Sequence, residues 1–222
     1  MIHLYFFVVG SIAASFLGVV IDRFPEQSIC FPASHCDACK KQLKARDLVP
    51  IFSQVFNRFH CRFCGQAIPI WYAVFECLGG FLTLAASYGI LSISEVILLF
   101  MSLTLSIYDS KHQEYPLLVW LFFQLPLWVI APFNLWSLLF LVISCLAQVI
   151  PIGIGAGDFL FLASATAIFS LTEILLMLQI ACLLGLATFI FQKKKDRLAF
   201  IPYLSIGVWI ILMIKLLLLS RY

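Results

Sequence analysis

Charged residues are scarce in this sequence of 222 residues. Lys, Arg, Asp and Glu together make up 11% of the chain against 63% for hydrophobic residues, and the mean hydropathy is +1.06. Soluble domains are about one-quarter charged and about half apolar. The composition therefore excludes an ordinary soluble globular domain and indicates a membrane protein.

The sequence also lacks the marks of two other classes. No Lys or Arg precedes the first apolar segment and no clear small-residue cleavage site follows it, so we expect no cleavable secretory signal. The net charge is only +3, and the basic residues lie between apolar segments rather than along one soluble face. We therefore expect no nucleic-acid partner.

Apolar segments of about 20 residues, the length that crosses about 30 Å of hydrocarbon, follow one another along the chain. They predict an all-α polytopic membrane protein in the lipid bilayer with about eight transmembrane helices. The third and sixth segments are short, which leaves six or seven spans possible. The predicted spans are residues 4–20, 70–91, 93–108, 117–131, 135–151, 158–171, 172–191 and 200–219.

Basic residues concentrate in the loop after the first predicted span and in the loop before the last. The positive-inside rule assigns both loops to the cytoplasm, as does an eight-span chain with its N-terminus outside. The sequence thus predicts a first transmembrane helix (1–21), a small cytoplasmic insert (22–69) and a membrane domain (70–222). The basic residues are Arg23, Lys40, Lys41, Lys44, Arg46, Arg58, Arg62, Lys193, Lys194, Lys195 and Arg197.

Four cysteines of the insert form two C-x-x-C pairs, Cys36 with Cys39 and Cys61 with Cys64, separated by 21 residues. This is the spacing of a zinc ribbon or knuckle, in which four thiolates surround one Zn²⁺ and supply folding energy that a small loop lacks. The alternatives are two disulfides, which are rare in the cytoplasm, or unpaired cysteines with accidental spacing. We predict structural zinc, because four protein ligands leave no open position for catalysis.

Acidic residues are rare within the apolar segments, where they are costly and tend to mark function. Asp109 follows the third predicted span and Asp158 begins the sixth, so the charge-derived topology puts both at the cytoplasmic face. Two carboxylates that share a proton can activate water and polarise a peptide carbonyl. Gly155 and Gly157 let the backbone before Asp158 bend. We predict an aspartic protease site, the alternative being that each aspartate caps a helix.

Together these features resemble the type IV prepilin leader peptidase family, whose second catalytic aspartate lies in a G-x-G-D motif. The family often has an acid, a lysine and a glycine where this chain has Leu117, Leu160 and Lys40. The matching segments, in the family's order, are Ser15–Pro25, the paired C-x-x-C insert, Tyr72–Glu76, Asp109 with Pro116 seven residues on, Gly155–Asp158 and Phe200–Leu204.

The resemblance implies that Asp109 and Asp158 are the catalytic pair and that the four cysteines bind zinc. It implies an aspartic endopeptidase of the bacterial cytoplasmic (inner) membrane that cleaves type IV prepilin or pseudopilin precursors after a glycine, on the cytoplasmic side. Family members with the insert are commonly also N-methyltransferases that use S-adenosylmethionine. No glycine-rich nucleotide loop reveals a cofactor site. Glu76, an acid within the second predicted span, is the first candidate, with an arginine-paired structural role as the alternative.

Two other classes stay open on the residues alone. Paired acids within a membrane also relay protons in transporters, although acids at one face rather than at the midplane argue against this. A zinc-dependent membrane scaffold without enzyme activity would need the cysteine insert and not the aspartates.

Overall fold

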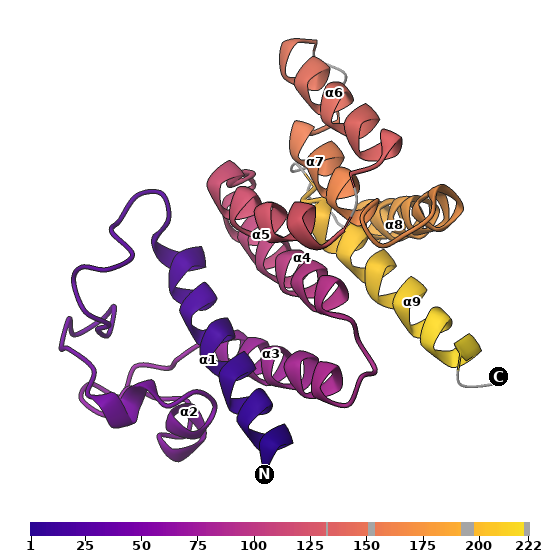
Figure 1. Cartoon of the computed structure of the whole chain (residues 1–222). Helices are drawn as coiled ribbons and strands as arrows, with labels where there is room; N and C mark the ends of the chain where they lie inside the picture. Colours follow the sequence, from indigo (N-terminus) through magenta and orange to yellow (C-terminus); the bar gives the residue numbers. More distant parts are fainter. Residues whose placement is uncertain (132, 151–153, 192–197, 220–222) are drawn as a thin grey trace. The chain divides into compact units, whose positions relative to one another are not determined.

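All regular secondary structure in the described part of the chain is helical (Figure 1). The computed structural model describes residues 1–131, 133–150, 154–191 and 198–219. Within them the prediction of an all-α protein is confirmed. The chain divides into two compact units, Met1–Leu91 and Ser92–Tyr222.

The first unit is an antiparallel helix pair with a long insert. Helix α1 (Ile2–Arg23) packs against α3 (Trp71–Ser87), and the insert holds the short helices η1 (Ala45–Leu48) and α2 (Phe52–Phe56). Glycines make the contact close: a Cβ added at Gly10 would lie 2.3 Å from the carbonyl oxygen of Gly79. Small residues of this kind let membrane helices pack with their backbones almost touching.

Side chains fix the register of this pair at both ends. Near the N-terminus, His3 Nδ1 lies 2.9 Å from Ser87 Oγ and the imidazole stacks on Tyr88. At the other end the Tyr72 hydroxyl donates a hydrogen bond to Asp22. Directly after it, Arg23 donates to the carbonyl oxygen of Pro32 at 2.7 Å, which shapes the start of the insert.

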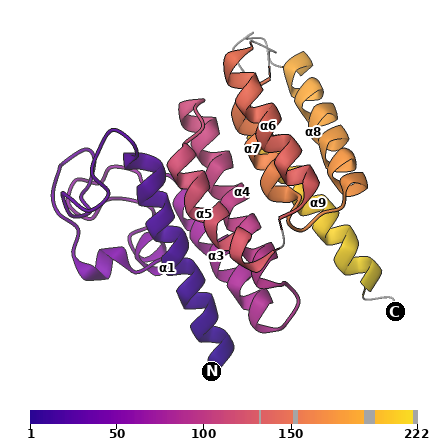
Figure 2. The ribbon, with the colours of Figure 1, turned by 45° about the horizontal axis from the view of Figure 1, so that its top comes forward.

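The second unit is a bundle of apolar helices. Helix α4 packs against α5 and α9, α6 packs against α7, and α8 packs against α9 (Figure 2). Its helices are α4 (Ile93–His112), α5 (Leu117–Ile130), α6 (Leu135–Val149), α7 (Ala156–Ala165), α8 (Leu171–Phe191) and α9 (Ile201–Leu219).

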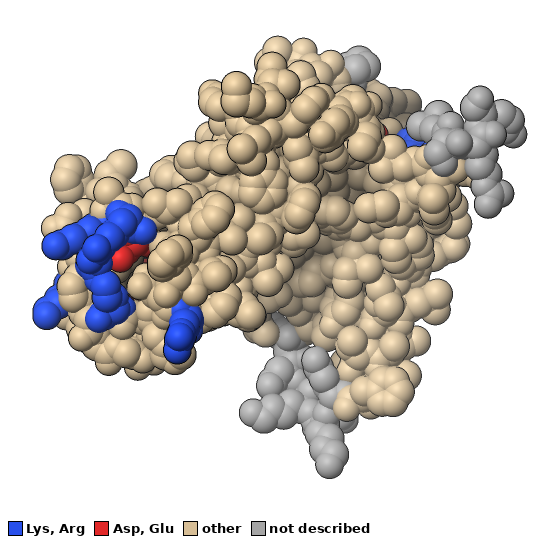
Figure 3. Space-filling model, turned by 90° about the horizontal axis from the view of Figure 1, so that it is seen from below, with Lys and Arg blue, Asp and Glu red and all other residues tan. Residues whose placement is uncertain are grey.

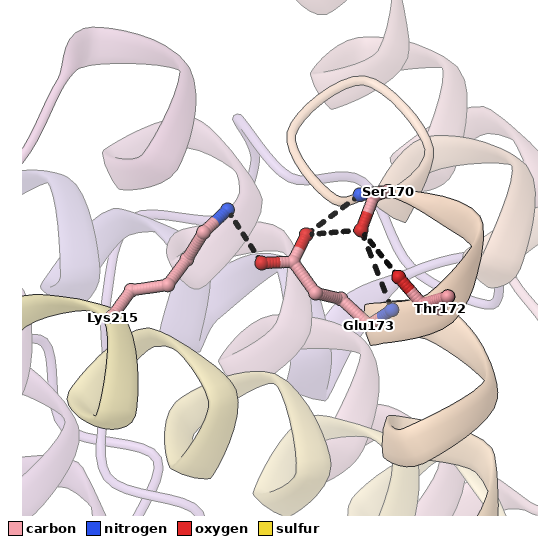
Figure 4. A network of polar contacts seen from close by, with 4 residues as sticks. All are labelled: Ser170, Thr172, Glu173 and Lys215. Atoms are coloured by element: carbon pink, nitrogen blue, oxygen red, sulfur yellow. Dashed lines mark hydrogen bonds and ion pairs between the residues drawn. The ribbon is translucent and has the colours of Figure 1, made fainter. Parts of the chain in front are cut away.

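Two glutamates, Glu95 and Glu173, cap the starts of helices in the second unit. Ser92 and Glu95 form a reciprocal capping box at the start of α4. Ser170 and Glu173 make the same exchange at α8, where Glu173 Oε2 accepts from the Ser170 backbone N–H at 2.7 Å. Glu173 also pairs with Lys215 of α9 at 3.0 Å (Figure 4). Such boxes satisfy backbone N–H groups that a helix start leaves free.

The helices identify a multi-pass membrane protein. Among the described residues, four helices are long and apolar enough to cross a bilayer, α1, α4, α8 and α9, and α3, α5, α6 and α7 are shorter apolar helices. Helix α7 has 10 residues, which span about 15 Å. Eight spans therefore remain a prediction. The basic residues Lys193, Lys194, Lys195 and Arg197, and the end of the predicted span 135–151, lie outside the described residues.

Candidate active site and candidate metal centre

The two C-x-x-C pairs adopt the same turn. In the first, the Lys40 N–H donates to the Cys36 carbonyl at 2.8 Å; in the second, the Gly65 N–H donates to the Cys61 carbonyl at 2.8 Å. Lys40 and Gly65 both have positive φ, 56° and 73°. Glycine adopts positive φ without strain. Lysine adopts it less favourably than glycine, yet the turn at Lys40 is the same as the turn at Gly65.

These turns bring four thiols to one point. The ligand atoms of Cys36, Cys39, Cys61 and Cys64 all lie within 4.8 Å of one another, and Cys36 Sγ is 3.8 Å from Cys64 Sγ. Sulfurs bound tetrahedrally at about 2.3 Å from one metal ion are themselves about 3.8 Å apart. The predicted ligands are thus together, in an arrangement that could hold a metal ion.

Backbone hydrogen bonds and burial shift the pKa values of two thiols of this cluster in opposite directions. The N–H groups of Cys64 and Phe63 hydrogen bond the Cys61 sulfur and lower the pKa of that thiol to about 7, whereas burial and the neighbouring thiols raise the pKa of Cys64 to about 11. The preceding histidines have other partners: His35 Nδ1 lies 3.0 Å from the Ala33 carbonyl oxygen and His60 Nδ1 lies 2.6 Å from that of Arg58. A thiolate is the form that binds metal, and it is the convergence of the four sulfurs that could hold a metal ion.

Glu76 joins the insert to helix α3. Its side chain is 5% exposed, and its Oε2 accepts from the Ile51 backbone N–H at 2.7 Å and from Gln54 Nε2 at 3.1 Å. Ile51 has φ 63°, so the bond holds a strained residue at the start of α2. The sequence left two roles open for Glu76, cofactor binding and an arginine-paired structural role. Its partners are an amide and a backbone group rather than an arginine, and they favour a structural role.

Removing this carboxylate is expected to loosen the insert. Glu76→Ala leaves the Ile51 N–H and the Gln54 amide without their acceptor, and each unsatisfied buried group costs about 1–3 kcal/mol. We expect faster hydrogen exchange at the Ile51 amide and a lower unfolding midpoint. Glu76→Gln, which keeps an acceptor oxygen, is the matched control and should lose less. Equal protection of Ile51 in the Ala variant and the unsubstituted protein would contradict this role.

Asp109 lies in the last turn of α4, against the start of α9. Its side chain is buried, and its Oδ2 accepts from the Ile201 backbone N–H at 3.2 Å. Two turns earlier, Ser205 of α9 donates to the Ser102 carbonyl oxygen at 3.0 Å. The first N–H groups of a helix have no partner within the helix and carry partial positive charge, so α9 presents a donor to Asp109.

Asp158 lies in the first turn of α7, which three polar contacts hold in position. Ser144 of α6 donates to the Ala156 carbonyl oxygen at 2.9 Å, and Trp120 and Gln124 of α5 both bond Ser164, at 2.8 and 2.5 Å. In an apolar environment such bonds have no water competing for their donors and acceptors. A short helix is thereby fixed between two neighbours.

The second unit brings the two aspartates into electrostatic reach of each other. The charge of Asp109 acts on Asp158, and both act on Tyr115, which precedes helix α5. The Tyr115 hydroxyl is buried and has no hydrogen-bond partner among the described residues. The Tyr115 ring covers Gly157: a Cβ added there would lie 2.3 Å from Tyr115 Cδ2. The glycine before Asp158 is therefore required by space as well as by backbone freedom.

Sequence reasoning missed two contributors to this region. Ile201 acts through its backbone N–H, which no residue type reveals, although Pro202 at the second position of α9 marks a helix start, where the first N–H groups need partners from outside the helix. Tyr115 stands directly before Pro116, where it resembles any interfacial aromatic. Only the fold brings its hydroxyl near both carboxylates.

Comparison with known proteins gives the family. The model of the Bacterial Peptidase A24 N-terminal domain matches residues 8–90. A prepilin leader peptidase/N-methyltransferase of Bacillus subtilis (strain 168) is 30% identical over 168 residues, which cover 68% of this chain and 67% of the relative. No solved structure gives a significant match.

Two further relatives with the same name match over shorter stretches. The Klebsiella pneumoniae protein is 34% identical over 50% of this chain, and the Myxococcus xanthus (strain DK1622) protein is 40% identical over 36% of it. The chain spans about half of the former relative (54%) and about a quarter of the latter (24%). The resemblance drawn from the motifs is confirmed, and the chain belongs to the prepilin leader peptidase/N-methyltransferase family.

Proposed function

We propose that this chain is a membrane aspartic endopeptidase that removes the leader peptide of type IV prepilin or pseudopilin precursors, cleaving after glycine. The proposal is supported by the placement of Asp109 and Asp158 in the second unit, where the charge of one carboxylate acts on the other. The family and the names of the relatives support the substrate class.

The chemistry follows from two carboxylates that share one proton. Close like charges resist double ionisation, so one group accepts a proton from water while the other donates to the carbonyl oxygen of the scissile bond. The Ile201 N–H orients Asp109, and the polar contacts of α7 orient Asp158. Fixed geometry of this kind lowers the cost of assembling water and peptide for attack.

The proposed topology has eight spans in the inner membrane, with the insert and both aspartates at the cytoplasmic side. The basic residues of the insert support this orientation through the positive-inside rule. We keep the functional division into a first transmembrane helix (1–21), an insert (22–69) and a peptidase domain (70–222). A proton-coupled transporter or a scaffold is less well supported, because the family contains processing enzymes.

We further propose that the four-cysteine cluster binds Zn²⁺ as a structural ion. Four soft ligands in a reducing compartment suit zinc, and the 3.8 Å separation of Cys36 and Cys64 fits its tetrahedral geometry. When bound, zinc would hold the two turns of the insert together. Catalysis at Asp109 and Asp158 needs no step at this ion.

Methylation of the new N-terminus is proposed as a second activity, since the relatives' names include N-methyltransferase. S-adenosylmethionine would supply the methyl group. The sequence predicts Glu76 as a cofactor residue, and that prediction is untested. The hydrogen bonds that its carboxylate accepts from Ile51 and Gln54 support a structural role for it. No step of methyl transfer is assigned to it.

The direct test is processing of a prepilin-like precursor by the purified protein in lipid nanodiscs. Mass spectrometry of the product should show a new N-terminus directly after the glycine of the leader. Adding S-adenosylmethionine should increase the product mass by one methyl group. An intact precursor, with the protein folded and zinc-loaded, would remove the peptidase assignment, whereas cleavage without methylation would remove only the second activity.

Gly157→Ala is expected to reduce cleavage sharply without unfolding the protein. The added Cβ collides with the Tyr115 ring and displaces the first turn of α7, and a misplacement of about 1 Å at a catalytic group costs about 10²-fold in rate. Gly185→Ala is the control, because its Cβ would meet Leu198 at 3.4 Å, an ordinary contact. Initial rates for both variants decide the point: equal rates would mean that Tyr115 and α7 yield without disturbing Asp158.

A further inference from the structure

Helix α2 has its polar side chains inside and its apolar side chains outside. Ser53 and Gln54 are buried, at 9% and 8% exposure, whereas Phe52, Val55 and Phe56 are 65%, 56% and 88% exposed. A helix at a water surface shows the reverse pattern. The outer face of α2 therefore suits a surrounding that is itself apolar.

The depth of α2 along the helix pair agrees with such a surrounding. Its polar side hydrogen bonds Glu76, five residues after Trp71 at the start of α3, which is about 7.5 Å along the helix. The Asp22–Tyr72 bond marks the corresponding end of α1. Helix α2 thus lies beside the first turns of α3 and not beyond its end, and Figure 1 shows the insert returning toward the helix pair.

Charge next to α2 indicates the kind of lipid surface. Lys44 precedes η1 and Arg46 lies within it, and η1 contacts α2. Arg58 follows α2, and all three side chains are exposed. Lys and Arg at an apolar boundary extend their charged ends toward headgroups, and anionic lipids attract such clusters. Figure 3 shows Lys and Arg gathered over one part of the face it presents.

We propose that α2 is an interfacial membrane anchor: Phe52, Val55 and Phe56 insert into the headgroup and acyl boundary of the leaflet beside α1 and α3, with anionic phospholipid as the occupant of this face. Burial of apolar side chains at about 25 cal/mol per Å² provides the driving force. The anchor holds the cysteine cluster at the membrane surface. It does not depend on the proposed peptidase activity.

The test follows a tryptophan introduced on this face. The full chain with Phe56→Trp is placed in vesicles of phosphatidylcholine and phosphatidylglycerol, and its emission is compared with that of the unsubstituted protein, which has five Trp. Lipids brominated in the upper acyl chain should quench the added emission by more than half, and acrylamide should quench it weakly. Val55→Trp repeats the measurement on the same face if Phe56→Trp folds poorly.

Gln66→Trp, at an exposed position in the second cysteine turn, is the matched control and should respond in the opposite way. Strong acrylamide quenching of Trp at 56 and 55, equal to that of the control, would overturn the proposal because the face would be in water. Protection from both quenchers would overturn it as well, since a protein surface would then cover the face.

Discussion

Asp109→Asn and Asp158→Asn are each expected to abolish precursor cleavage while leaving the protein folded. An amide neither accepts the proton of the attacking water nor shares a proton with the remaining carboxylate. General acid and base catalysis contributes about 10²–10⁴-fold per group, so the rate should fall below detection in a standard processing assay. Asn keeps an oxygen for the Ile201 N–H that Asp109 accepts, which preserves the contact between α4 and α9.

A matched acid at the opposite end of α4 provides the control. Glu95 belongs to the capping box with Ser92 and makes no contact with the aspartates in the described structure. Glu95→Gln should lower the unfolding midpoint slightly and leave the cleavage rate unchanged. Cleavage that persists in either Asp variant would sink the assignment of a catalytic pair.

Loss of metal is expected to have the second largest effect. Structural zinc in small domains contributes about 10–16 kcal/mol at neutral pH, and the insert has little apolar core of its own. Cys36→Ser or Cys61→Ser should therefore abolish stoichiometric zinc, measured by plasma mass spectrometry, and expose residues 22–69 to limited proteolysis. A strong chelator should do the same to the unsubstituted protein.

Cys30 serves as the control, since it lies in the same insert but outside the cluster. Cys30→Ser should keep one zinc per chain and full protease resistance. Zinc-free protein with a protease-resistant insert would show that the turns of the insert fold without metal, and the structural role would have to be abandoned.

Hydropathy predicted where the helices lie better than where they end. The helix that starts at residue 93 extends to His112 rather than to 108, because Gln113 adopts the left-handed conformation that stops α4. In place of the predicted span 158–171 the structure has the ten-residue helix Ala156–Ala165. A turn follows this helix and leads to the capping box that begins at Ser170. Capping and turn geometry, which average hydropathy ignores, decide these limits.

The candidate site was predictable to the extent that it depends on residue types at short spacing. Two C-x-x-C pairs are visible because each pair is local, and the fold had only to bring the pairs together. The partners of Glu76, the Ile201 N–H and the Tyr115 hydroxyl come from segments distant in sequence. Their roles depend on backbone groups and packing, which leave no pattern of residue types.

Helix α9 meets Asp109 through Ile201 at one end and Glu173 through Lys215 at the other. Fourteen residues of helix separate the two contacts, a length of about 21 Å that side-chain motion does not alter. Helix α9 therefore keeps a fixed distance between its two contacts. It sets how far Asp109, in the last turn of α4, lies from Glu173, in the first turn of α8.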